Sequence, residues 1–169
     1  MPLPVEEYPL FQPWYDSSDV DELKKYIIKE DREKREYTFH RRRWKGNTEF
    51  NRMFKSETVT IIPVEVDGEK YFKPKSVHLT YGPFFGKKRE QTLNYLQKLK
   101  NDLKRCIGYD VIEIKPSPER LVRLDIDCEK VTIHGCQKII CSLFELEENI
   151  IGMNFYSPEF YGPEIFRRH

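Results

Sequence analysis

Apolar residues along the chain follow two spacings, one typical of helices and one typical of strands. The clearest helical spacing lies in residues 87–106, and Gly108 is expected to end that helix as a C-cap. Its apolar stripe is made of Leu93, Leu96, Leu99, Leu103 and Cys106. Similar but shorter spacings predict two more helices, at residues 18–33 and 137–148.

Strand-like segments lie between these helices. Residues 58–66 and 70–81 are rich in β-branched and aromatic side chains, and the Asp67-Gly68 pair between them predicts a hairpin. Residues 109–114 predict another strand, and residues 121–133 predict a longer strand or a tight hairpin. The basic and aromatic segment 34–55 follows neither spacing, so its structure stays ambiguous.

The order of these elements predicts an α+β fold. We expect an antiparallel sheet built from two hairpins, with interleaved helices packed on one face. This domain would span residues 18–150. The flanking segments 1–17 and 151–169 combine prolines with large aromatic residues, so they are expected to be extended arms.

The aromatic residues of the two arms must pack on something. Either they bind a neighbouring subunit of an assembly, or they pack on the core of their own domain. The candidate partner-binding residues are Phe11, Trp14, Tyr15, Phe155, Tyr156, Phe160 and Tyr161.

Composition narrows the class of protein. Aromatic residues make up 14% of the 169, which favours a folded chain although 34% are charged. The four cysteines form no CxxC pair and share no ligand spacing with histidine, so we expect no metal and no cofactor. No apolar run approaches the roughly 20 residues of a membrane span, so an intracellular protein of the cytoplasm or nucleus is expected.

The net charge of +1 hides a strong segregation of charge. Residues 34–55 hold eight basic and two acidic side chains, and residues 87–105 hold seven and two. Residues 1–33 hold nine acidic and four basic side chains. Such asymmetry indicates either a polyanionic partner or an internal match between the acidic N-terminal segment and a basic surface of the same chain.

The helix start at residues 87–89 carries three cations where the helix dipole favours acids by about 0.3–1 kcal/mol each. With the glycine-bounded turn before it, this placement predicts an anion site. Guanidinium groups beside a tryptophan in segment 41–45 suit phosphates and a stacked base. The candidate RNA-binding residues are Arg41, Arg42, Arg43, Trp44, Lys45, Lys87, Lys88, Arg89, Lys98 and Arg105. The alternatives are a solvated run of charge and a surface for an acidic protein.

Two short stretches resemble known families. Glu113-Ile114-Lys115 resembles the ExK half of the PD-(D/E)xK nucleases, a resemblance that implies a metal held by an acidic pair, although no Pro-Asp partner strand precedes it. Segment 86–135 resembles the second half of a KH RNA-binding domain. It departs from that family because three residues separate Gly82 from Gly86 where the KH loop has two, and because no helix is predicted before the turn.

No complete catalytic motif is present, so the sequence favours a non-enzymatic RNA-binding or ribonucleoprotein-associated subunit. The first alternative is a protein-binding scaffold in a multi-subunit complex. The second is a metal-dependent nuclease acting through Glu113 and Lys115.

Overall fold

Six antiparallel strands form one sheet in the computed structural model, which describes residues 9–46, 52–118 and 120–152. The strand order is β1-β2-β3-β4-β6-β5. The strands are β1 (Ile27–Asp31), β2 (Glu36–Lys45), β3 (Met53–Val66), β4 (Glu69–Gly82), β5 (Ile112–Lys115) and β6 (Val122–Asp127). The prediction of an α+β fold with an antiparallel sheet is therefore confirmed, although the sheet has more strands than two hairpins supply.

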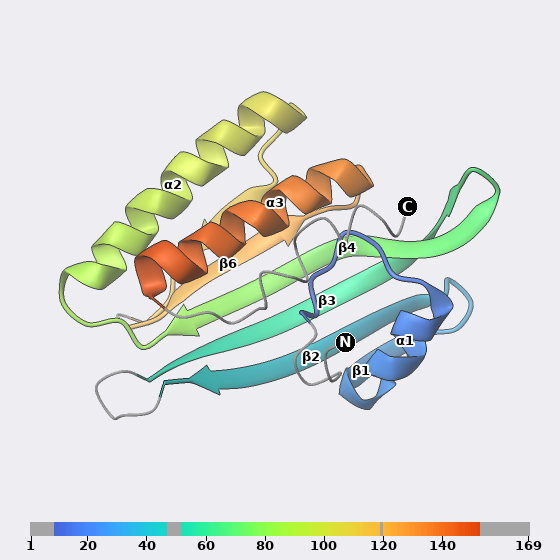
Figure 1. The fold of residues 1–169 in the computed structure, drawn as a ribbon, viewed down its shortest axis with the longest axis horizontal. Helices are drawn as coiled ribbons and strands as arrows, with labels where there is room; N and C mark the ends of the chain where they lie inside the picture. Colours follow the sequence, from blue (N-terminus) through green and yellow to red (C-terminus); the bar gives the residue numbers. More distant parts are fainter. Residues whose placement is uncertain (1–8, 47–51, 119, 153–169) are drawn as a thin grey trace.

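Three α-helices accompany the sheet. They are α1 (Ser17–Leu23), which continues into the 3-10 turn η2 (Lys24–Tyr26), α2 (Lys87–Ile107), and α3 (Ile133–Glu145), which continues into the π-helical turn η3 (Leu146–Ile151). Figure 1 shows α2 and α3 side by side on one side of the sheet. Within the described residues, no helix is both long and apolar enough to cross a membrane.

Segment 18–33 differs most from its prediction. The helix starts at its cap Asp16, whose side chain accepts from the Asp19 backbone while Asp19 reciprocates. It ends at Leu23, and Ile27 already belongs to β1. The helical spacing arises because Val20 and Leu23 of α1 and Ile27 of β1 all contact the same core.

The core lies between the helices and the inner face of the sheet. Along β3, alternate residues from Met53 to Ile61 are buried, which is the period expected of a strand covered on one face. Three leucines of the predicted α2 stripe are buried against that layer, and Gly108 ends the helix in a left-handed conformation. Segment 121–133 is a strand only over residues 122–127, because a turn at residues 128–131 leads into α3, which Thr132 caps by accepting from the Gly135 backbone.

The described part of the N-terminal arm belongs to this core. Leu10, Phe11, Trp14 and Tyr15 are all at most 4% exposed. Tyr15 also exchanges two backbone hydrogen bonds of 2.8 Å with Phe72 of β4. For Phe11, Trp14 and Tyr15 the structure thus places the aromatic rings in their own domain, which was the alternative to partner binding. Phe155, Tyr156, Phe160 and Tyr161 lie outside the described residues.

Candidate nucleic-acid interface

The predicted basic cluster at residues 41–45 lies on β2, whose alternation divides it between the two faces of the sheet. Arg41 is buried and Arg43 nearly so, whereas Arg42 and Trp44 are exposed on the outer face. The five candidate residues therefore do not share one surface, because successive side chains of a strand point in opposite directions.

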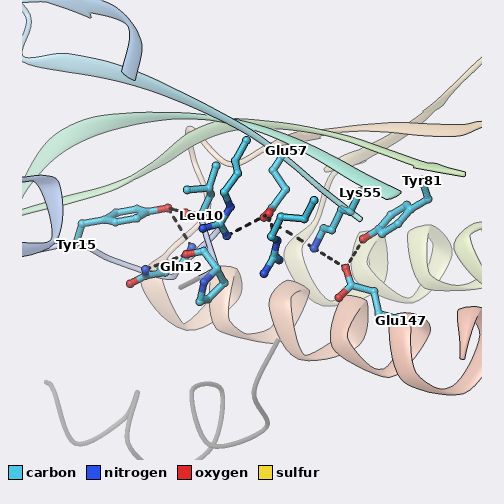
Figure 2. Close-up of polar contacts among 10 residues, drawn as sticks. Leu10, Gln12, Tyr15, Lys55, Glu57, Tyr81 and Glu147 are labelled. Carbon is cyan, nitrogen blue, oxygen red and sulfur yellow. Dashed lines mark hydrogen bonds and ion pairs between the residues drawn. The ribbon is translucent and has the colours of Figure 1, made fainter. Parts of the chain in front are cut away.

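The inward-facing arginines bind a glutamate in the core. The Nη2 atoms of Arg41 and Arg43 lie 3.5 and 3.3 Å from Oε1 of Glu57, which is completely buried on β3. Figure 2 shows Glu57 at the centre of this polar cluster, with Lys55 beside it. These two arginines of β2 therefore bind a buried carboxylate of the neighbouring strand β3 and are not presented to a ligand.

Lys55 continues the cluster toward the helical layer. Its Nζ lies 2.5 Å from Oε1 of Glu147 in η3, and the Tyr81 hydroxyl donates to the same oxygen at 2.6 Å. Figure 2 shows Lys55 and Tyr81 converging on Glu147 from the sheet. The ion pair thus ties β3 to the π-helical turn, and we call these residues with Arg41, Arg43 and Glu57 the buried charge network.

Burial and charge act against each other in this network. Burial alone would raise the pKa of Glu57, but the positive charges of Lys55, Arg43 and Arg41 outweigh it and hold that pKa below its usual value. Burial raises the pKa of Glu147 despite the opposing charge of Lys55. Burial lowers the pKa of Lys55, because it disfavours the charged ammonium group. Removing one member of the network would leave a buried charge without its partner, which is strongly destabilising.

Replacing Tyr81 with phenylalanine tests the hydrogen bond to Glu147. The variant leaves a buried carboxylate with one donor fewer, so the free energy of unfolding should fall by about 1.5–3 kcal/mol in urea denaturation. Tyr95→Phe is the matched control, because its half-buried hydroxyl donates over 3.3 Å to the carbonyl of Ser142 and interacts with the exposed carboxylate of Glu145. Equal losses in the two variants would mean that the burial of Glu147 adds nothing to the bond.

On the outer face, aromatic rings and guanidinium groups gather where β2 ends and β3 begins. The rings of Trp44 and Phe54 lie 5.0 Å apart, the guanidinium carbon of Arg42 lies 5.4 Å from the Phe54 ring, and that of Arg52 lies 4.3 Å from the Trp44 ring. Trp44 remains 48% exposed. We call these four residues the Trp44 cluster; Arg52 and Phe54 were missed from the sequence.

A line of three cations and two hydroxyl side chains crosses the outer face beside the Trp44 cluster. The strand register places Arg42, Ser56, Thr80, Arg123 and Lys115 opposite one another on successive strands. We call this line the arginine row. Arg42 and Arg123 are three strand spacings apart, or about 14 Å. Sequence reasoning missed Arg123, although the inward alternation of Val122, Leu124 and Ile126 already placed it outside.

The turn before α2 lies at the same end of the sheet. Gly82 pairs with Phe54, and a side chain at Gly82 would collide with the Arg120 carbonyl and Leu121, so the turn packs tightly on residues 120–121. Arg89 donates through Nε to the Leu121 carbonyl at 3.3 Å. The structure thus brings Arg89, from the predicted anion site, next to Arg120, and both line a pocket with the exposed Phe85.

The other predicted cations are dispersed. Lys87 and Lys88 are exposed in the first turn of α2, and Lys45 is half-buried at the end of β2. Lys98 is exposed further along α2, outside the residues that line the pocket. Arg105 binds Asp102 about 24 Å along the helix from Arg89. The predicted track along α2 therefore does not continue the arginine row.

The structure shows where the residues of the two family resemblances lie. Lys115 lies 3.2 Å from Glu113 and 3.7 Å from Asp125, which also binds His78 at 2.6 Å. Among the described residues no three histidine, cysteine or acidic side chains are placed to hold a metal ion. The order of elements differs from that of a KH domain, because strand β4, and not a helix, leads into the turn before α2.

Comparison with known proteins adds no relative. No family model, curated protein or solved structure matches the chain. A function for this surface must therefore be argued from its own geometry.

Proposed function

We propose that the protein is a non-enzymatic module that binds single-stranded RNA on the outer face of its sheet. The observation that carries this proposal is the Trp44 cluster, an exposed tryptophan and a phenylalanine flanked by two arginines. Unpaired bases stack on aromatic rings, and guanidinium groups bind phosphates through paired N–H donors. Both kinds of contact are offered within one small area.

The arginine row gives the RNA backbone a direction across the sheet. Arg42 and Arg123 supply charge for phosphates, and the hydroxyls of Ser56 and Thr80 lie between them as neutral donors. The adjacent line on the face contains the acidic side chains of Asp125 and Glu113. These carboxylates repel phosphates, so the backbone is expected to follow the arginine row and the Trp44 cluster.

The alternative of a protein-binding scaffold has less support. It expects the aromatic arms and the basic surfaces to bind partners, and Phe11, Trp14 and Tyr15 are instead buried in the core of their own domain. No described residue of the arms favours a docked partner. For the nuclease alternative, the described residues contain no group of three or more histidine, cysteine or acidic side chains that could hold a metal ion.

The proposal predicts that Trp44→Ala weakens binding of a fluorescein-labelled single-stranded RNA about 5- to 150-fold, the loss expected for one stacked base. Affinity of the unchanged protein should fall steeply as salt rises, and Arg123→Gln should make that dependence shallower. Fluorescence anisotropy over a series of salt concentrations measures both effects.

Two control variants separate this surface from general charge and exposure. Ile28→Ala removes an exposed apolar side chain on edge strand β1, and Lys98→Gln removes an exposed cation of α2. Both should bind RNA like the unchanged protein. Absence of binding at low salt, or equal losses in Lys98→Gln and Arg123→Gln, would contradict the proposal.

A further inference from the structure

A pocket opens at the start of α2, at the end of the sheet that carries the Trp44 cluster. Its volume is about 490 Å³, within the range of roughly 300–1,000 Å³ that holds small ligands. Its lining includes Phe84, Phe85, Arg89, Glu90, Asn94 and Arg120. These residues supply two aromatic rings, two guanidinium groups, a carboxylate and an amide.

Phe85 gives the pocket a surface for stacking. The ring is 61% exposed, which is unusual for a phenylalanine, and the guanidinium carbon of Arg120 lies 4.9 Å from its centre. A planar cation against an aromatic ring is a stable arrangement, and it leaves most of the ring uncovered. A flat heterocycle can therefore stack on Phe85 while its charged substituent meets Arg120.

Arg89 gives the pocket a second, positioned cation. Its Nε–H is held by the Leu121 carbonyl, and the guanidinium has four further N–H donors. Within the described residues no acid forms an ion pair with Arg89 or Arg120, and these two cations outnumber Glu90, the one acid among the residues that line the pocket. Two guanidinium groups on one small cavity match the oxygens of a phosphate.

Glu90 and Asn94 lie one helical turn apart and line the same cavity. A carboxylate accepts hydrogen bonds, and an amide both donates and accepts them. These are the groups that recognise the edge of a base. The pocket thus offers separate places for a ring, for its polar edge and for a phosphate.

We propose that this pocket holds one nucleotide of the bound RNA, with its base stacked on Phe85 and its phosphate bound by Arg89 and Arg120. The inference rests on the proposed RNA binding and adds to it a site for a single nucleotide. Residues 120–123 join the two surfaces, because Arg120 lines the pocket and Arg123 belongs to the arginine row. An RNA strand that follows the row thereby reaches the pocket.

The test uses the full chain and the four nucleoside 5′-monophosphates, with the matching nucleosides and inorganic phosphate as comparison ligands, in isothermal titration calorimetry. At least one monophosphate should bind about tenfold more tightly than its nucleoside, and Arg120→Gln should remove that preference. Phe85→Ala should weaken both ligands. Lys98→Gln removes an exposed cation of the same helix outside the pocket, so it should change neither the affinity for the monophosphate nor that for the nucleoside.

The design separates this inference from RNA binding itself. Trp44→Ala should weaken RNA binding and leave the affinity for the monophosphate unchanged. If no monophosphate binds, or if inorganic phosphate binds as tightly, the nucleotide site is wrong while RNA binding on the sheet stands. If monophosphates bind but single-stranded RNA does not, the proposed function is wrong and the pocket stands. Urea denaturation checks that Phe85→Ala and Arg120→Gln remain folded.

Discussion

Replacing Glu57 with glutamine is expected to lower the free energy of unfolding by about 3–5 kcal/mol. The side chain keeps its size but loses its charge, and Arg41, Arg43 and Lys55 then lose the negative charge that lies between them. Because Glu57 is completely buried, water cannot replace it. Urea denaturation followed by circular dichroism measures the loss.

Glu113→Gln is the matched control for Glu57→Gln. It makes the same chemical change on the outer face of the sheet, where Glu113 is 67% exposed. Substitutions at such positions change stability by about 0.5 kcal/mol or less. If the two variants were equally stable, the buried charge network would not contribute through its charges.

Trp14→Ala is expected to cost about 3–5 kcal/mol, because it removes a large ring from the core and leaves a cavity that the structure cannot fully close. Trp14 is 4% exposed and packs edge-on against Tyr71 with ring centres 5.1 Å apart. Thermal or urea denaturation of the variant measures the loss. Such a result would show that the N-terminal arm contributes to the stability of the folded domain.

The chain supplies its own comparison, because it has only two tryptophans. Trp44→Ala removes a ring that is half exposed, so its cost should be at most about 1 kcal/mol, from lost cross-strand contacts. Intrinsic fluorescence should show the same contrast, with Trp14 shielded from an aqueous quencher and Trp44 accessible to it. Similar stability losses would place Trp14 outside the core.

Elements with an unbroken apolar period were predictable from the sequence. Helix α2 has a leucine stripe and a terminal glycine, and both agree with the structure. The turn at Asp67-Gly68 likewise has positive φ angles at both residues, as the sequence pair suggests. In these segments local preference and tertiary packing require the same residues.

Strand β2 and the start of β3 were not predictable, because their inner faces carry charge. Arg41, Arg43, Lys55 and Glu57 occupy positions that an alternating strand normally gives to apolar residues. The period of two is therefore absent from the hydropathy pattern, and the sequence shows only a basic, aromatic segment of ambiguous structure. Only the pairing between distant segments shows that these charges neutralise one another.

The candidate site was predictable in part. Arg42, Trp44 and Arg89 were named from local composition, and the structure places all three at one end of the sheet. Arg120 and Arg123 were not found, because each is a single cation in an ordinary segment. Their relation to Phe85 and Arg42 arises from strand pairing and from the close packing at Gly82, which sequence distance does not reveal.

The backbone pairing of Tyr15 with Phe72 has a consequence for self-association. The outer part of the β3–β4 hairpin extends beyond the strands that flank it, since β2 pairs with β3 only as far as Ile61 and β6 pairs with β4 only from Ser76. Unpaired strand edges invite pairing with another chain. Tyr15 pairs with the β4 edge of this extension. On the β3 edge, Pro63 has no backbone N–H to donate to another strand. Loss of the arm would therefore promote aggregation through exposed strands.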